Sequence, residues 1–416
     1  MSSERKLLLA CARSRLTPED RRRIIDLAGG DLDWDQLAII SYAHGIAPLV
    51  YHSLVEGDAI GLVTVAVAQK LRSSYYANAA RNSLLYDELK TLQLALGQEK
   101  LDVIILKGAA LAETVYPHRA LRPMSDIDLL VRRERLADVE SKLLSMGYAV
   151  DASTHEYHRE HHYHLVFTKS AAPNIEIHWG LQRPTGPFRI DIQNLWERSQ
   201  KTQIAGIEAL VLSTEDLVLH LCQHFWKHNL AGGIRPICDI AETTRYYGDG
   251  VDWTKVANTS SEWEMNAGSY LVLSLARELL DAPIPKDFLN EVRPVNFNMD
   301  VIHWAREVVL GYGECPLVFP DLVKLFWKGF SSKERWAILQ KTLSRGTVAR
   351  YANDTMAAKR GYLYYPLRMK HLLTQYGQTV GRLWAGDRRI RAAATTEEKQ
   401  QRLTKWLSSS SLNSPL

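Results

Sequence analysis

Three carboxylates stand in stretches that otherwise read as buried β-strands. Asp126 and Asp128 begin the run "DIDLLV", and Glu176 lies between two isoleucines in "NIEIHWGL". Side chains two residues apart on a strand share one face, with Cα atoms roughly 6.6 Å apart. We therefore expect Asp126 and Asp128 to project together while Ile127 enters the core. A buried carboxylate is costly unless it is paired or bound to a metal, and carboxylate oxygens are ligands that Mg²⁺ prefers.

A set of three strand carboxylates could hold two metal ions, which clamp the attacking and leaving oxygens of a phosphoryl transfer. Each of these residues also has a structural interpretation. Asp126 and Asp128 could be solvated aspartates on an edge strand. Glu176 could be a rim residue paired with an arginine, and His178, on the same strand, could be a hydrogen-bonded structural histidine.

A glycine turn precedes the aspartate pair. The run "LDVIILKG" predicts a strand that ends at Lys107 and Gly108, and "AALAETVY" predicts the helix that follows. Backbone N–H groups at a helix N-terminus can hold a phosphate. Gly108 would allow a close approach and Lys107 would add positive charge. The spacing is not that of a GxxxxGK[ST] loop.

The flanking elements predict an α/β unit between helical regions. Leucines at 85, 89, 92 and 96 form one helical stripe before it. After it, Ser213 and Asp216 are spaced as a capping box that opens another helix. We expect four regions, which are a helical region over 1–100, an α/β core over 101–190, a helical region over 191–403 and a disordered tail over 404–416.

Composition limits the cellular setting. The four cysteines among 416 residues are scattered and form no CxxC pair, so we expect a reducing, cytoplasmic environment without a cysteine-based zinc site. Residues 1–23 show no signal peptide pattern, and no apolar run approaches the length of a membrane span.

Positive charge gathers toward the C-terminus. Residues 321–416 carry about eighteen Lys and Arg against six Asp and Glu. One interpretation is a solvated helical surface. The other is a patch that meets an anionic partner, either a polyanion or a membrane surface. The sequence does not choose between them.

These motifs together resemble the nucleotidyltransferase superfamily, with its polymerase-beta-like fold and its pattern hG[GS], Dh[DE]h and h[DE]h, where h is apolar. The closer resemblance is to a poorly characterised bacterial nucleotidyltransferase family that reads LKG…R…DIDLLV…GY…EIHW. The corresponding pieces here are "ILKGAAL", Arg122, "DIDLLV", "MGYAV" and "IEIHWGL". The resemblance extends from about Asp33 to Ala241. Lys107 stands where the superfamily usually has a glycine.

The resemblance implies an α+β fold, in which a small mixed-sheet core is flanked by N-terminal helices and a large C-terminal helical region. It also implies transfer of a nucleoside monophosphate from an NTP, such as ATP, to an acceptor, with release of pyrophosphate. Asp126 and Asp128 would ligate Mg²⁺ or Mn²⁺, and Glu176 would be the third carboxylate, as a ligand or as the base for an acceptor hydroxyl.

Four further residues form the expected nucleotide-binding set. Gly108 would lie at the phosphate turn with Lys107 near the triphosphate, and we infer that Arg122 neutralises the leaving pyrophosphate. His178 completes the set. The acceptor stays open among a sugar, a small metabolite, a peptide, a protein hydroxyl and an RNA end. The preferred NTP and the oligomeric state are equally open.

Two other functions compete with this one. Histidines at 155, 158, 161, 162 and 164, and at 220, 224 and 228, could hold zinc in a hydrolase, although Leu221 stands where HExxH has its glutamate. His224 and His228, with Arg235 and Asp239, could instead line the nucleotide or acceptor cleft. The third possibility is a catalytically silent binding or assembly factor that uses the basic C-terminal surface.

Overall fold

The computed structural model describes residues 1–151, 155–295 and 297–312, with isolated residues at 332, 336, 398, 399, 402, 403 and 406. The chain divides into two compact units, of which the first takes in Met1–Tyr312 and Trp406–Leu416. The helices and strands over residues 1–312 all belong to this first unit. Nearly all of the basic stretch over 321–416, and of the tail over 404–416, lies outside the described residues.

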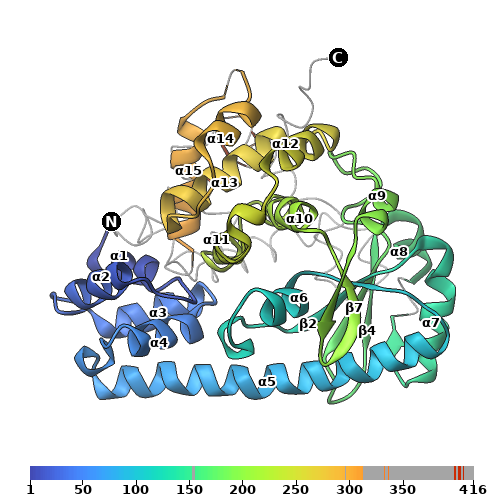
Figure 1. The fold of residues 1–416 in the computed structure, drawn as a ribbon, viewed down its shortest axis with the longest axis horizontal. Helices are drawn as coiled ribbons and strands as arrows, with labels where there is room; N and C mark the ends of the chain where they lie inside the picture. The colour runs from blue at the N-terminus through green and yellow to red at the C-terminus, as the bar shows by residue number, and fades with distance from the viewer. Residues whose placement is uncertain are drawn as a thin grey trace, which may run out of the picture. The chain divides into compact units, whose positions relative to one another are not determined.

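The N-terminal region is helical, as its pattern predicts. Its helices are α1 (Ser3–Ala10), α2 (Pro18–Ala28), α3 (Trp34–Ala43), α4 (Ala47–Glu56) and α5 (Val65–Gln98). Side-chain caps define the starts of several, including a full capping box at α2 between Thr17 and Asp20. The long helix α5 packs against α3 and α4 at one end and against the sheet at the other (Figure 1).

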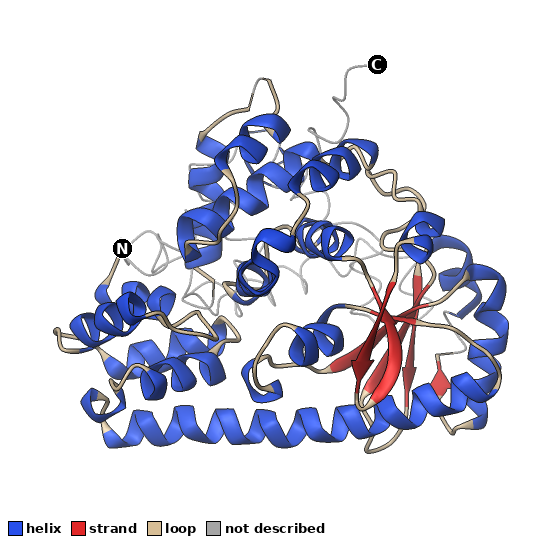
Figure 2. Ribbon diagram, in the orientation of Figure 1, coloured by secondary structure: helices blue, strands red, loops and turns tan. Residues whose placement is uncertain are grey.

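A seven-stranded mixed sheet follows (Figure 2), in the order β3-β4-β5-β2-β1-β7-β6. Its strands are β1 (Ile104–Ile105), β2 (Asp126–Leu130), β3 (Ala149–Val150), β4 (His164–Thr168), β5 (Asn174–His178), β6 (Gln200–Ile204) and β7 (Ile207–Val211). Strands β6 and β7 lie beyond the end expected for the α/β core near residue 190. They form a hairpin whose turn residues, Ala205 and Gly206, both have positive φ, as tight hairpins require.

Helices cover the sheet and then make up the rest of the unit. Those between the strands are α6 (Lys107–Thr114), α7 (Leu136–Ser145), α8 (His155–His161) and α9 (Ile192–Glu197). The later ones are α10 (Thr214–Lys227), α11 (Arg235–Tyr247), α12 (Trp253–Glu262), α13 (Asn266–Leu280), α14 (Lys286–Val292) and α15 (Asp300–Leu310). Ser213 caps α10 through the Asp216 N–H. The α+β architecture is therefore confirmed.

Two observations bear on the cellular setting. Cys11, Cys222 and Cys238 are buried free thiols, while Cys315 lies outside the described residues. Among the helices that the structure describes, none combines the length and the apolar character that crossing a bilayer requires.

The leucine stripe of α5 is the support on which the sheet rests. Leu85, Leu89, Leu92 and Leu96 are buried in one cluster with the apolar side chains of β2 and β5. We expect Leu89→Ala to lower the free energy of unfolding by about 2–5 kcal/mol, because it leaves a cavity under the sheet. Urea unfolding followed by circular dichroism would measure this. Leu84→Ala is the matched control, since that side chain on the same helix is 69 % exposed. Equal losses in the two variants would contradict this packing.

Candidate active site

The pairing of two parallel strands brings the predicted carboxylates together. In the register of β2 and β5, Asp128 lies directly opposite Glu176, and Ile127 opposite Ile175. Strand β2 has neighbours on both sides, so the edge-strand interpretation of its aspartates is wrong. The expectation that Ile127 enters the core is confirmed, because its side chain is fully buried there.

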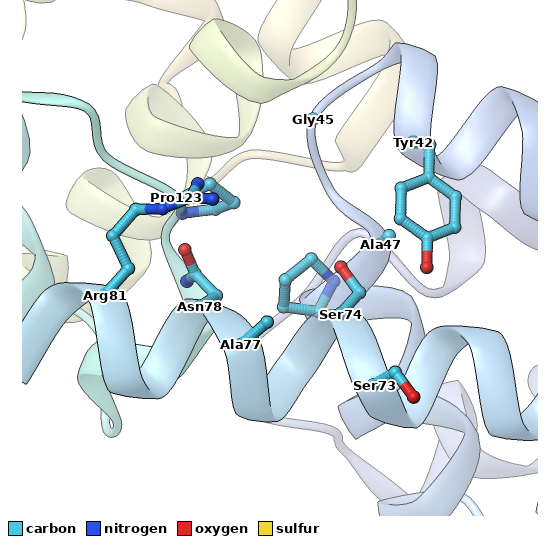
Figure 3. Close-up of a pocket in the computed structure, with 10 residues that line it drawn as sticks. Tyr42, Gly45, Ala47, Ser73, Ser74, Ala77, Asn78, Arg81 and Pro123 are labelled. Carbon is cyan, nitrogen blue, oxygen red and sulfur yellow. The ribbon is translucent and has the colours of Figure 1, made fainter.

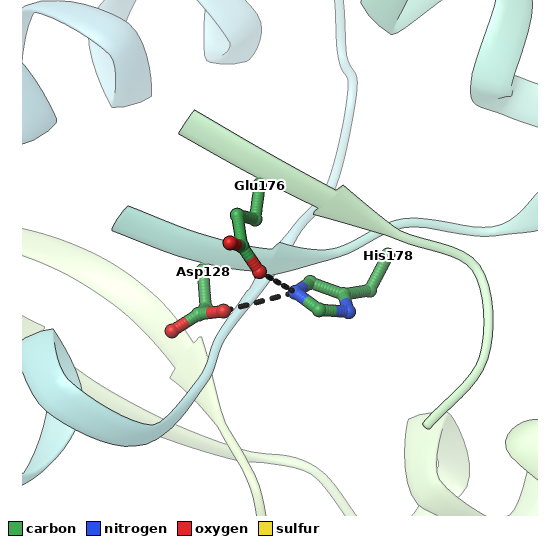
Figure 4. Close-up of side chains that lie close together, drawn as sticks. All are labelled: Asp128, Glu176 and His178. Atoms are coloured by element: carbon green, nitrogen blue, oxygen red, sulfur yellow. Dashed lines mark hydrogen bonds and ion pairs between the residues drawn. The ribbon is translucent and has the colours of Figure 1, made fainter. Parts of the chain in front are cut away.

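Asp128, Glu176 and His178 form a compact group of potential metal ligands. One ligand atom from each lies within 4.8 Å of the other two. His178 Nε2 lies 2.9 Å from Asp128 Oδ1 and 3.4 Å from Glu176 Oε2, so one ring nitrogen faces both carboxylates (Figure 4). Two carboxylate oxygens and an imidazole nitrogen are donors that suit a divalent cation such as Mn²⁺, and the carboxylates alone suit Mg²⁺.

Asp126 stands at the half-buried end of the same strand face. It is not one of the three residues of the compact group. Burial raises the pKa of Asp126, and the negative charges of Asp128 and Glu176 raise it further. The repulsion among these carboxylates is what a divalent cation beside them would relieve.

Lys107 is the cation that lies against this cluster. It is the first residue of α6, it has a positive φ of 42°, and its Nζ lies 2.6 Å from Asp128 Oδ1. Burial alone would raise the pKa of Asp128, but Lys107 and His178 outweigh it and hold that pKa well below its usual range. Lys107 is thus placed at the carboxylates, and its expected contact with a triphosphate stays a prediction.

Gly108 is required by the close approach of Arg122. A Cβ at Gly108 would overlap the Arg122 guanidinium and would come within 3.1 Å of Met124 Sδ. Arg122 in turn makes two hydrogen bonds to Asp239 of α11, from Nη2 at 2.9 Å and from Nε at 3.2 Å. Tyr116 Oη donates a third to the same carboxylate. The turn, the arginine and the C-terminal helices therefore meet at one buried ion pair.

Pro123, the next residue after Arg122, borders a hollow of about 460 Å³. Figure 3 shows Arg81, Asn78 and Ser74 of α5 on one side of it, with the turn between α3 and α4 on the other. Asn78 Nδ2 donates to the Ala120 carbonyl, so this side chain mainly anchors the loop that leads into β2.

Helix α10 closes the site from the helical side. Neither ring nitrogen of His220, nor Nδ1 of His224, has a hydrogen-bond partner in the described part of the chain. Burial, followed by the positive charges of Lys107 and Lys227, lowers the pKa of both histidines well below the usual range. Both imidazoles are therefore neutral. The expectation that His224 lines the cleft stays a prediction.

The zinc interpretation has no support in the described residues. Within them, the group of three or more His, Cys, Asp or Glu side chains that could share an ion is Asp128, Glu176 and His178. Neither histidine-rich stretch forms such a set of its own there.

Two residues that the sequence motifs do not include stand next to the cluster. Lys227 Nζ donates to Tyr163 Oη at 2.6 Å, and the Tyr163 ring lies 5.9 Å from the His178 ring, centroid to centroid. Burial, together with the charge of Lys107, lowers the pKa of Lys227 to about 8. The helical spacing could have pointed to Lys227, because it follows His220 by seven residues and so lies on the same face of the helix.

The buried pair between Arg122 and Asp239 should matter greatly for stability. We expect Asp239→Ala to lower the free energy of unfolding by about 3–5 kcal/mol, because it strands a buried guanidinium without its partner. Asp35→Ala is the control, since Asp35 pairs with Lys70 at the surface and its loss should cost no more than about 1 kcal/mol. Urea unfolding of both variants would test this. A loss below that of the control would show that the Arg122 pair does not hold the core to α11.

Comparison with known protein families matches residues 30–281 to the family described as "Uncharacterised nucleotidyltransferase". No curated protein and no solved structure matches the chain. The matched residues include every strand of the sheet, the carboxylate cluster and helices α10 and α11. They make up more than half of the sequence, and the chain belongs to this family of nucleotidyltransferases.

Proposed function

We propose that this protein transfers a nucleoside monophosphate from an NTP to an acceptor, with release of pyrophosphate, in the cytoplasm and with Mg²⁺ or Mn²⁺ as its metal. The observation that carries the proposal is the β2–β5 register, which sets Asp128 against Glu176 in a chain of this family, with His178 Nε2 facing both. ATP is the first NTP to test.

The carboxylates account for the metal requirement. Asp128 and Glu176 would hold the cation, with Asp126 and His178 beside them. When bound, the cation supplies positive charge to the transferred phosphate and to the leaving oxygen. Glu176 is half-buried and can accept the proton of an acceptor hydroxyl, whereas Asp128 is enclosed. The other side chains act by alignment and charge.

The end of the site near Asp126 is suited to the phosphates. The α6 N-terminus and Gly108 are there, and Arg235 adds a cation from the start of α11. No hydrogen bond or ion pair joins the Arg235 guanidinium to another described residue. Burial, followed by the neighbouring charge of Arg122, lowers the pKa of Arg235. Asp239 already forms an ion pair with Arg122. Arg235 therefore contributes the positive charge that is available to a triphosphate.

We expect Asp128→Asn to abolish the reaction while leaving the fold intact. Its metal-dependent release of pyrophosphate from ATP should fall more than about a hundredfold, because a ligand of the cation is lost. Release would be followed with a coupled phosphate assay across a Mg²⁺ and Mn²⁺ titration, and folding by thermal unfolding. Asp87→Asn, at an exposed position on α5, is the matched control. Unchanged turnover in a folded Asp128→Asn protein would contradict the proposal that Asp128 binds the catalytic cation.

Arg235 gives a second test, in which affinity and stability should separate. Arg235→Gln should weaken binding of metal–ATP by about tenfold or more, because a charge-assisted contact is removed. Its free energy of unfolding should stay the same or rise, because the arginine pairs with no described residue. Isothermal titration and urea unfolding measure the two quantities, with Arg306→Gln, on α15, as the control. A destabilised variant with unchanged affinity would assign Arg235 a purely structural role.

A further inference from the structure

A pocket of about 870 Å³ opens beside the carboxylate cluster. One wall is the chain that follows β5, around Gln182 to Arg189, and the other is the C-terminal end of α10. Binding sites for small molecules usually have volumes of about 300–1,000 Å³. The three carboxylates do not line this pocket. Tyr163 and Lys227 do, so the pocket and the cluster share a border.

The lining combines an aromatic wall with uncompensated positive charge. Phe188 and Trp226 meet edge to face, with ring centroids 6.0 Å apart, and both are largely buried. Lys227 makes its hydrogen bond to Tyr163, and no described carboxylate forms an ion pair with it. The pocket's one described acid, Glu264, is already paired with Arg189 at 2.9 Å. Such a lining suits a planar, negatively charged molecule.

The position of the pocket separates it from the phosphate end. Strands β2 and β5 run in the same direction, from Asp126 toward Leu130 and from Asn174 toward His178. Gly108, Arg122 and Arg235 gather near the first end of this carboxylate row. Tyr163 and Lys227 lie past the other end, beyond His178. In a transfer reaction the leaving group and the nucleophile lie on opposite sides of the transferred phosphorus.

We propose that this pocket holds the acceptor, a small molecule with a planar ring system and an anionic group, and that Lys227 pairs with that group. The proposal rests on the proposed nucleotidyl transfer. An acceptor hydroxyl oxygen forms the new bond to the α-phosphorus, and the bond to the bridging oxygen between the α- and β-phosphorus breaks. That oxygen keeps the electron pair and leaves in pyrophosphate, and the hydroxyl proton passes to Glu176.

A planar anion of known structure can test the pocket before the acceptor is identified. We would titrate the protein with 8-anilinonaphthalene-1-sulfonate and, in parallel, with N-phenyl-1-naphthylamine, which has the same rings and no sulfonate. Lys227→Gln should weaken binding of the sulfonate about tenfold and leave the uncharged compound unchanged. Phe188→Ala should weaken both. Lys201→Gln, which removes an exposed lysine of the β6–β7 hairpin, should change neither.

Competition then identifies what the pocket takes. Saturating metal–ATP should not displace the sulfonate, because the nucleotide's phosphates bind at the other end of the carboxylate row. Displacement by metal–ATP would make this the nucleotide pocket, and displacement by a single-stranded oligonucleotide would make the acceptor a nucleic acid. Equal affinity of wild type and Lys227→Gln for the sulfonate would also overturn the proposal. A protein that binds the sulfonate as expected but binds none of the four NTPs in the presence of metal would instead refute the nucleotidyl transfer itself.

Discussion

The parallel pairing of β2 with β5 is the constraint on which the site depends. It brings Asp128 and Glu176 to the same level of the sheet, although they lie far apart in the chain. Two like charges at that distance repel each other, and burial makes each of them costlier. Lys107 from α6 and His178 offset this cost, because both contact Asp128 Oδ1. A divalent cation bound there would also reduce the repulsion between Asp128 and Glu176.

A second buried pair ties this core to the helices that cover it. Arg122 comes from the loop before β2 and Asp239 from α11, so their contact fixes the helical region against the sheet. Gly108 has to be a glycine for the arginine to reach that position. The pair also explains why Arg122 and Arg235 differ. Both lie near Asp126, but Asp239 accepts hydrogen bonds only from Arg122. We propose that Arg235 is the arginine that meets the phosphates.

The surroundings of the carboxylates differ chemically on their two sides. Arginine and a helix N-terminus lie near Asp126, while an aromatic and lysine-lined pocket lies past His178. Helix α10 also carries the neutral imidazoles of His220 and His224. A transferase has to bind two substrates around one phosphorus, and we propose that each of these two sides takes one of them.

Local sequence pattern was enough to predict most of the helices and strands and to single out the three strand carboxylates. The period-two alternation of apolar residues identified Asp126, Asp128 and Glu176 as charged residues on otherwise apolar strands. The leucine stripe over residues 85–96 predicted the buried face of α5. Periodicity predicts which side chains share a face of a strand or helix, because that depends only on residues close together in the chain. The same local signals missed the β6–β7 hairpin, whose first strand is polar and lies at the edge of the sheet.

Which distant residues contact one another depends on the packing of the whole fold. Nothing near Arg122 in the sequence indicates Asp239 as its partner, and Lys227 at the end of α10 meets Tyr163, which lies 64 residues earlier in the chain. The contact of His178 with both carboxylates likewise depends on the strand register, because its Nε2 lies 2.9 Å from Asp128 and 3.4 Å from Glu176. Contacts between distant segments depend on how whole elements pack, and local sequence pattern does not encode that packing.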